Sequence, residues 1–185
     1  LITTTMSVFA CVKGAGNPSA TKYVVSKLDV GANQRLWMLG NTNAAQTARV
    51  LLYDTNGTTV KKDYYSSLTV FDDAWNHFGF TFDSGTLKIY SQGAEDSSVT
   101  KSTDDAITAL WSSTAAMTIG SALISGAVLG AIDADIDEVR ISNIARSAPW
   151  IKATYNSLWD SLITFGAEET LPMNIPAEPL EGTFT

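Results

Sequence analysis

The sequence has few of the residues on which metal, disulfide and nucleic-acid chemistry depend. Its 185 residues include one cysteine and one histidine, and 12 Lys and Arg stand against 19 Asp and Glu. A single cysteine forms no intrachain disulfide, and a single histidine cannot supply a two-histidine metal site. The net charge of −7 argues against binding a nucleic-acid backbone, so we expect no nucleic-acid partner.

Long apolar runs are also missing. No stretch approaches the roughly 20 residues that cross a bilayer, so we expect no membrane insertion. The one cysteine, Cys11, lies in an apolar run, which indicates a buried and inert thiol. The sequence begins at Leu1 rather than Met, and we interpret it as a processed or excised piece of a longer protein.

Short β-rich runs separated by turn residues occupy much of the chain. The predicted strands cover residues 6–13, 23–27, 35–39, 48–53, 77–90 (a hairpin) and 116–120. In the hairpin, Phe78, Phe80 and Phe82 alternate and therefore share one face of a strand. Leu87 and Ile89 are predicted to meet this row from the returning strand.

Several segments are predicted to be loops. Asn56-Gly57 indicates a hairpin turn between two β-rich runs. Residues 91–114 are polar and predict a long loop, with a short helical turn near 104–110 as one alternative. Residues 121–130 are rich in Gly and Ala and predict a loop, whereas the prolines in residues 170–185 predict a linker or extended arm.

One short helix is predicted near the C-terminal end. Ser147 is a suitable N-cap, and Pro149 is tolerated in the first helical turn. Apolar residues then recur with helical spacing at Ile151, Tyr155 and Leu158. Residues 162–167 predict a last strand. The expected fold is therefore all-β, an antiparallel two-sheet jelly-roll sandwich with one short C-terminal helix.

Two segments resemble the laminin-G-like, concanavalin A-like lectin and glucanase family. Residues 75–93 (WNHFGFTFDSGTLKIYSQG) are similar to that family's W-x-H-x-A-x-T-x-D-x-G-x-L-x-L-Y signature. Residues 130–143 (GAIDADIDEVRISN) are similar to its closing strand. The resemblance covers roughly residues 6–169 and implies a sandwich over residues 1–169 that lacks the family's opening strand.

The resemblance also implies where several aromatic residues lie. Trp75, Trp150 and Tyr155 match core positions and should be buried, and His77 should pack at the start of a strand. Cys11 stands where the family usually has a tryptophan, which departs from the family's packing at that end.

The aspartate-rich strand carries three alternative interpretations. Asp133, Asp135 and Asp137 alternate, so a regular strand would place them on one face. Hydrolases of this fold use carboxylates at such a spacing, but with Glu where this chain has Asp. Asp133 and Asp135 are also candidate ligands for Ca²⁺, which prefers carboxylate and carbonyl oxygens and which domains of this family often bind.

The third interpretation is structural. Asp137 and Glu138 would satisfy turn amides or pair with Arg140 and Arg146. The apolar residues of this strand change parity, which predicts a β-bulge between Ile136 and Val139.

The candidate ligand-binding residues are aromatic. Exposed aromatic rings stack on the C–H faces of sugars. Trp111, in the polar loop, is the first candidate, and Tyr53 and Tyr64 (with Tyr65) flank the predicted hairpin turn and could face a groove.

Three functions are consistent with the sequence. The first is a non-catalytic extracellular interaction module that binds carbohydrate or a protein partner. The second is a structural or assembly domain of a virion or surface filament, with residues 170–185 lying on a neighbouring subunit. The third and weakest is a glycan hydrolase. In each case we expect the protein to be extracellular, at a cell surface or in a virion.

Overall fold

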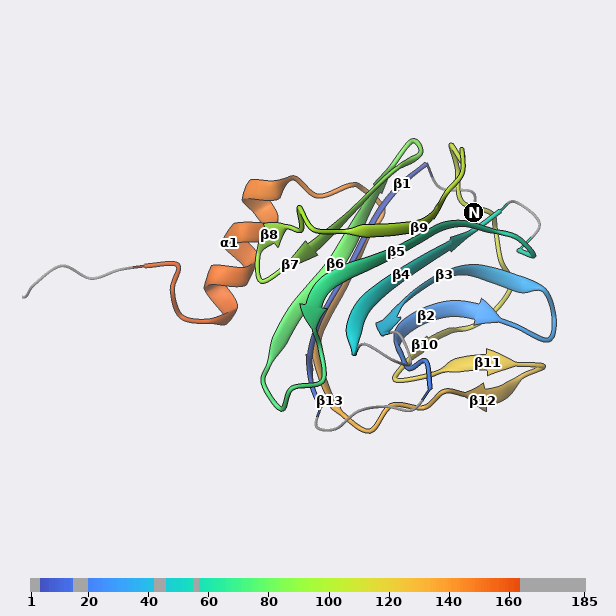
Figure 1. Cartoon of the computed structure of the whole chain (residues 1–185), viewed down its shortest axis with the longest axis horizontal. Helices are drawn as coiled ribbons and strands as arrows, with labels where there is room; N and C mark the ends of the chain where they lie inside the picture. Colours follow the sequence, from blue (N-terminus) through green and yellow to red (C-terminus); the bar gives the residue numbers. More distant parts are fainter. Residues whose placement is uncertain (1–3, 15–19, 42–45, 55–56, 164–185) are drawn as a thin grey trace, which may run out of the picture.

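Two sheets pack face to face in the computed structural model, which describes residues 4–14, 20–41, 46–54 and 57–163 (Figure 1). One sheet has five strands in the order β13-β1-β6-β7-β8. The other has eight strands, in the order β12-β11-β2-β3-β4-β5-β9 with β10 also paired to β2. The predicted all-β sandwich with one short C-terminal helix is confirmed.

The strands and the helix have the following bounds. The five-stranded sheet contains β1 (Thr5–Lys13), β6 (Asn76–Asp83), β7 (Thr86–Ser91), β8 (Ala94–Glu95) and β13 (Asp135–Ser142). The eight-stranded sheet contains β2 (Tyr23–Asp29), β3 (Gln34–Asn41), β4 (Thr47–Tyr53), β5 (Val60–Thr69), β9 (Thr100–Asp104), β10 (Met117–Ile119), β11 (Ala122–Ile124) and β12 (Ala127–Leu129). The helix α1 spans Ala148–Leu158.

The main core lies between the two sheets and contains the predicted phenylalanine row. Phe78, Phe80 and Phe82 are fully buried. Their β7 neighbours are also as predicted, since Ile89 pairs with Phe80 and Leu87 with Phe82. The row is buried because alternate residues of a strand point to the same face, and β6 turns its aromatic face to the opposite sheet.

The helix α1 covers the outer face of the five-stranded sheet (Figure 1). Ile151 is fully buried there against Phe9 and Tyr90, and Trp150 packs at the margin of the same cluster. The predicted N-cap is confirmed, because the Ser147 side chain accepts a hydrogen bond from the backbone N–H of Trp150. The described part of the chain has no helix with the length and apolar character of a membrane span.

Removing the helix cap should have a modest effect on stability. We expect Ser147→Ala to lower the free energy of unfolding by about 0.5–1 kcal/mol, because one amide of the first turn loses its acceptor. Ser157→Ala is the matched control, since Ser157 is exposed within the same helix and Ala is the better helix former. Urea denaturation of both variants checks this, and equal midpoints would contradict a capping role for Ser147.

Two predicted loops contain strands. Residues 91–114 were predicted as a loop with a possible helical turn, but they contain β8 and β9, and β9 pairs with β5. No helix forms at residues 104–110. The polar sequence was misleading because β9 is an edge strand, and its Ser and Thr side chains can face solvent while the backbone pairs.

Residues 121–130 form a hairpin rather than the predicted loop. β11 and β12 are joined at Ser125 and Gly126, which both have positive φ (50° and 79°) as a tight hairpin turn requires. The Asp29 carboxylate accepts hydrogen bonds from both turn amides, at 2.6 and 2.9 Å. A contact across 96 residues therefore fixes a turn that short-range sequence did not indicate.

Two further expectations are wrong. Trp75 was expected in the core, but 40% of it is exposed, because it precedes β6 and lies at the rim of the sandwich. Leu162 and Ile163 were expected to start a last strand, yet both are exposed and follow α1 without pairing. The rest of that strand and the arm at residues 170–185 lie outside the described residues.

The predicted bulge in β13 is confirmed. Phe9 of β1 pairs with Arg140 and Cys11 pairs with Asp137, so two residues of β13 face one residue of β1. Glu138 has a φ of +51°, a left-handed conformation that few non-glycine residues adopt. The bulge alters which way the acidic side chains of this strand point.

Candidate functional site

A group of polar and aromatic side chains lies on the outer face of the eight-stranded sheet. On β4, Ala48, Val50 and Leu52 are fully buried in the core, so the alternate residues Arg49 and Tyr53 point outward. Three neighbours complete what we call the outer-face group, which consists of Tyr23, Arg49, Tyr53, Asp63 and Tyr65.

Arg49 and Asp63 form the centre of the outer-face group. Nε and Nη2 of Arg49 each donate a hydrogen bond of 2.8 Å to a different oxygen of Asp63. This two-point geometry is the strong form of an ion pair. The Tyr65 hydroxyl donates to the same carboxylate at 3.1 Å, and the Arg49 guanidinium carbon lies 4.9 Å from the Tyr65 ring centre. The three side chains therefore hold one another in place.

The Arg49 guanidinium stays charged in this setting. Burial alone would lower its pKa, but the hydrogen bond and the charge of Asp63 outweigh burial, so the pKa of Arg49 is raised. Its side chain is 21% exposed and that of Asp63 is 10% exposed. Two of the five guanidinium N–H groups serve Asp63, which leaves other donors at the surface.

Tyrosines flank this pair along the sheet. Tyr23 aligns with Gly40, Gly40 with Arg49, and Arg49 with Tyr65, so the four residues form one row across β2, β3, β4 and β5. A row of paired residues places its side chains on the same face. Tyrosine rings thus lie on both sides of the arginine within one continuous surface.

Tyr53 adds a third partly exposed ring. The Arg35 guanidinium carbon lies 5.9 Å from its ring centre. Burial raises the pKa of both Tyr53 and Tyr23, so both phenols carry their protons at neutral pH and can donate hydrogen bonds. The group offers donors, a carboxylate acceptor and ring faces within one patch.

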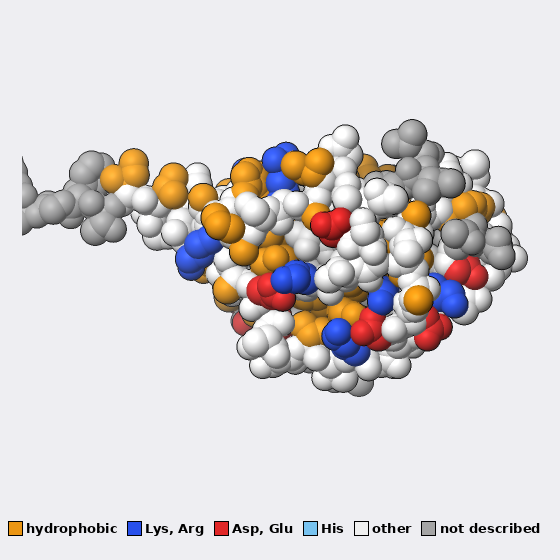
Figure 2. All heavy atoms as spheres, turned by 90° about the horizontal axis from the view of Figure 1, so that it is seen from above, with side chains coloured by type: hydrophobic (Ala, Val, Ile, Leu, Met, Phe, Trp, Pro, Cys, Tyr) orange, Lys and Arg blue, Asp and Glu red, His pale blue; other side chains and the backbone are white. Residues whose placement is uncertain are grey.

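The face of the molecule seen from above carries charges of both signs (Figure 2). In the view from above, Lys and Arg lie beside Asp and Glu, and apolar side chains are visible between them (Figure 2). This side carries no field of one sign.

The predicted metal ligands lie at another place. Asp133 and Asp135 line an open cavity of about 290 Å³ with Asp73, Lys13 and other residues. Among the described residues, no three or more His, Cys, Asp and Glu side chains are placed to hold a metal ion. These side chains do not form a complete ligand set, and calcium at Asp133 and Asp135 stays a prediction.

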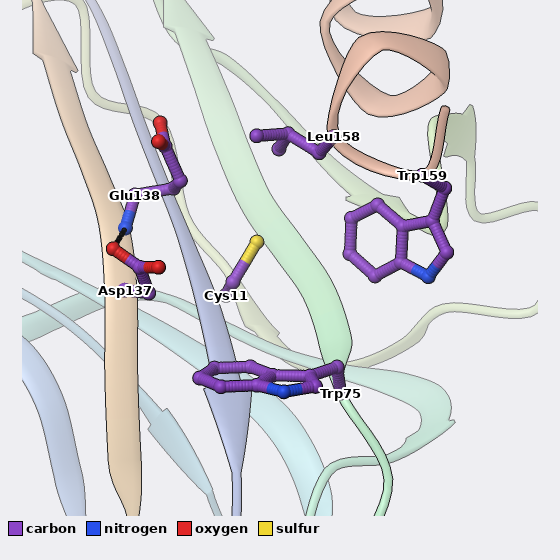
Figure 3. A pocket seen from close by; sticks show the side chains of 6 residues that line it. All are labelled: Cys11, Trp75, Asp137, Glu138, Leu158 and Trp159. Carbon is purple, nitrogen blue, oxygen red and sulfur yellow. Dashed lines mark hydrogen bonds between the residues drawn. The ribbon is translucent and has the colours of Figure 1, made fainter. Parts of the chain in front are cut away.

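The three aspartates do not share one site. Asp137 lines a different pocket, with Glu138 and Cys11 (Figure 3). The Asp137 carboxylate accepts a hydrogen bond from the Glu138 backbone N–H at 2.7 Å, and Glu138 forms an ion pair with Arg140 at 2.6 Å. The structural interpretation of Asp137 and Glu138 is thus confirmed for these two contacts.

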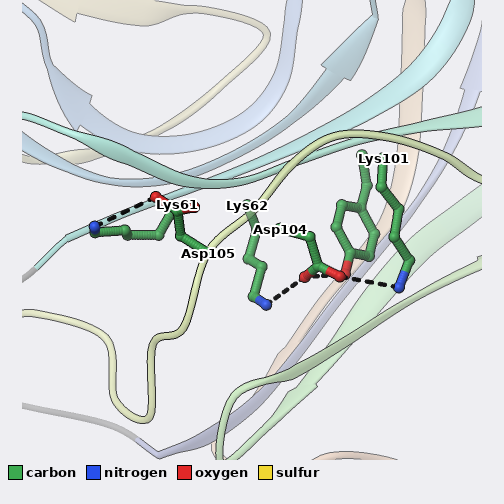
Figure 4. Close-up of polar contacts among 6 residues, drawn as sticks. Lys61, Lys62, Lys101, Asp104 and Asp105 are labelled. Carbon is green, nitrogen blue, oxygen red and sulfur yellow. Dashed lines mark hydrogen bonds and ion pairs between the residues drawn. The ribbon is translucent and has the colours of Figure 1, made fainter.

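Tyr64 points to the core, away from the outer-face group. It is 3% exposed, and its hydroxyl donates a hydrogen bond of 2.6 Å to Asp104. Lys62 and Lys101 bind the same carboxylate (Figure 4). Tyr64 follows Asp63 by one residue, so the period of two along a strand directs it to the opposite face.

Trp111, the first sequence candidate, is partly buried. It packs against the main core, and its ring would lie 2.7 Å from a Cβ placed on Gly57. Gly57 therefore leaves the space that the ring occupies at the hairpin turn. Trp111 is therefore held by packing against the core.

The sequence did not predict three residues of the outer-face group as ligand-binding candidates: Tyr23, Arg49 and Asp63. A signal was present, because residues 47–53 (TARVLLY) place Arg and Tyr at alternate positions between buried residues. Alternation predicts the face of each residue. It does not predict that Asp63, 14 residues later, lies beside Arg49.

Comparison with known proteins assigns the chain to a family. A sequence model of the concanavalin A-like lectin/glucanases superfamily, of laminin G type, matches residues 1–152, and the chain belongs to this superfamily. The recognition made from the two motifs is thus confirmed. A comparison with curated proteins finds no significant match.

Solved structures share the fold at low sequence identity. The CBM40 of the Ruminococcus gnavus IT-sialidase, bound to α2,3-sialyllactose, has a TM-score of 0.63 and 16% identity, with 82% of each chain covered. A heptameric SAP-like pentraxin from Limulus polyphemus has a TM-score of 0.57 and 12% identity, covering 83% of this chain and 70% of that one.

A receptor-binding domain is also similar. That of the botulinum neurotoxin C/D mosaic serotype has a TM-score of 0.58 and 18% identity. The match covers 83% of this chain and 36% of the toxin chain. Binding domains are thus prominent among the similar structures, and the chain spans only about a third of this one.

Proposed function

We propose that this domain is a non-catalytic, extracellular carbohydrate-binding module that takes its ligand on the outer-face group. Arg49 and Asp63 would bind sugar hydroxyls, and Tyr23, Tyr53 and Tyr65 would present ring faces and hydroxyls around them. The observation that carries the proposal is the two-point Arg49–Asp63 pair, flanked by tyrosines on an open sheet face.

The chemistry of the group suits a neutral or acidic sugar. A sugar ring has an apolar C–H face, which stacks on aromatic rings, and hydroxyls that need both donors and acceptors. The remaining N–H groups of Arg49 are donors, and Asp63 is an acceptor that is already oriented. Because the ion pair fixes both side chains, little side-chain freedom would be lost when a ligand binds.

The similar structures support a binding role. Of those described above, the CBM40 is a module bound to a sialylated lactose, and the toxin domain is named for receptor binding. At 16% and 18% identity these structures share the fold of this chain and no more, so the proposed function rests on the geometry of the outer-face group.

A glycan-array screen tests the proposal. We expect the wild-type domain to retain a defined set of glycans and Arg49→Lys to weaken that binding about tenfold or more, because lysine keeps the charge but loses the two-point fork. Arg146→Lys is the matched control, since Arg146 lies against Trp150 at the helix, away from this sheet. Circular dichroism verifies that both variants fold.

The same screen, run in calcium and then in chelator, tests the predicted metal. Binding that is lost in chelator and in Asp133→Asn would support a calcium ion at Asp133 and Asp135. Glycan binding that persists in chelator and in Asp133→Asn would contradict a calcium ion in the binding site and would leave the proposed role of Arg49 unchanged. Retention of no glycan, or equal weakening by both arginine variants, would contradict the proposed site.

A further inference from the structure

A second pocket lies between the end of α1 and the bulge of β13, on the other sheet of the sandwich. Its volume is about 290 Å³. The side chains that line it are two indoles, two carboxylates, one thiol and one aliphatic group, namely Trp75, Trp159, Asp137, Glu138, Cys11 and Leu158 (Figure 3). None of these residues belongs to the outer-face group.

The bulge brings both carboxylates to the same pocket. In a regular strand Asp137 and Glu138 would point to opposite faces, because successive side chains alternate. The positive φ of Glu138, +51°, breaks this alternation, and both side chains line the cavity. Strained residues of this kind are concentrated at binding sites, where the surroundings hold them in place.

One of the two aromatic walls, Trp159, is held in place before any ligand binds. Trp159 stacks on Tyr155, with ring centres 4.6 Å apart, and His77 meets the Trp159 ring edge to face, with ring centres 6.3 Å apart. His77 in turn stacks on Phe9 at 5.5 Å. Trp75 is 40% exposed, and Figure 3 shows its ring flat against one side of the space into which the Cys11 sulfur points. A pre-organised wall loses little freedom on binding.

The lining favours positive charge. Within the part of the chain that the structure describes, no Lys or Arg lines the pocket. Burial lowers the pKa of His77 to about 4 and raises that of Cys11 to about 12, so both groups are neutral at pH 7. Arg140 compensates Glu138, but Asp137 has no ion pair among the described residues. Negative charge therefore stands opposite two indole rings.

We propose that this pocket binds a small organic cation that carries a methylated ammonium group. The ammonium would lie against the indole faces of Trp75 and Trp159, and Asp137 would face its charge. Aromatic faces attract such cations through their quadrupole, and the methyl groups gain contacts that a hydrated metal ion would not make. The two carboxylates of the lining would repel an anion. This site is separate from the outer-face group.

Titration with choline tests this proposal, because its carbon isostere 3,3-dimethylbutan-1-ol has the same shape without the charge. We expect choline to quench tryptophan fluorescence saturably in the millimolar range and the isostere not to. Trp75→Ala should abolish the signal and the binding measured by calorimetry, whereas Trp75→Phe should retain part of it. These measurements use the full chain of 185 residues.

Two aspartate variants distinguish a charge in the pocket from a general charge effect. Asp137→Asn should weaken choline binding about tenfold, whereas Asp83→Asn, which removes the same charge from an exposed position at the end of β6 outside the pocket, should not. Failure of choline to bind, equal binding of the neutral isostere, or equal effects of the two aspartate variants would overturn the proposal.

Discussion

Phe80→Ala is expected to lower the free energy of unfolding by about 3–5 kcal/mol, the largest effect of any variant considered for this domain. Phe80 is fully buried, and its ring meets Trp37 of the opposite sheet edge to face, with ring centres 6.1 Å apart. On its own sheet it pairs with Val8 and Ile89. Truncation therefore removes contacts between the sheets and leaves a cavity that the paired strands cannot collapse to fill.

Phe80→Leu is the control for this prediction. It keeps a large apolar side chain and should cost about 1.5 kcal/mol or less. Urea denaturation measures both variants, and the slope should stay close to that of wild type if each unfolds in one cooperative step. A loss below about 1 kcal/mol for Phe80→Ala would show that the two sheets depend little on this contact.

Asp104→Ala is expected to cost about 2–3 kcal/mol because one carboxylate serves three partners. Lys62, Tyr64 and Lys101 all direct polar groups at it (Figure 4). Lys62 is 6% exposed and Tyr64 is 3% exposed, so removal of Asp104 leaves a buried ammonium and a buried hydroxyl without this acceptor. Since the Asp104 side chain is itself 39% exposed, water can replace part of the interaction, and the loss stays below that of a fully buried pair.

The neighbouring Asp105 provides a matched control. It pairs with Lys61 at 3.5 Å, and its side chain is 58% exposed. Asp105→Ala removes the same charge from the next residue and should change stability by less than about 0.5 kcal/mol. Equal losses for the two variants would indicate a general charge effect and contradict the importance of the Lys62 contact.

The contribution of Asp104 should depend on pH. The hydrogen bond from Lys62, followed by that from Tyr64, holds the pKa of Asp104 well below its usual range. A carboxyl with a lowered pKa adds stability above its unfolded pKa, about 3.9, and that stability is lost as the pH falls. The difference between wild type and Asp104→Ala should thus be constant above about pH 5 and shrink below about pH 4.

Much of the fold could be predicted because its signals are local. The alternation of Phe78, Phe80 and Phe82 predicted a buried strand face, and Ser147 predicted the start of α1. The apolar residues of β13 change from even to odd positions between Ile136 and Val139, and this change predicted the β-bulge. Each of these depends on residues that are close in sequence and on backbone geometry that repeats every two or 3.6 residues.

The missed strands lacked that local signal. β9 is polar on both faces because it is an edge strand, and it pairs with β5 from about 40 residues away. The β11–β12 hairpin depends on Asp29, a residue on a strand distant in sequence. Trp75 was placed in the core by resemblance alone, yet it lies at the rim beside the end of α1.

The sequence by itself determined the class of fold and, in strands with regular alternation such as β6, the face of each residue, because alternation and capping act over a few bonds. Only the tertiary structure decided which outward side chains meet. The pairing of β4 with β5 joins Arg49 to Asp63, and the docking of α1 brings Trp159 to Asp137 and Trp75. Both candidate sites are made of side chains from different elements, and strand register and helix packing bring such side chains together.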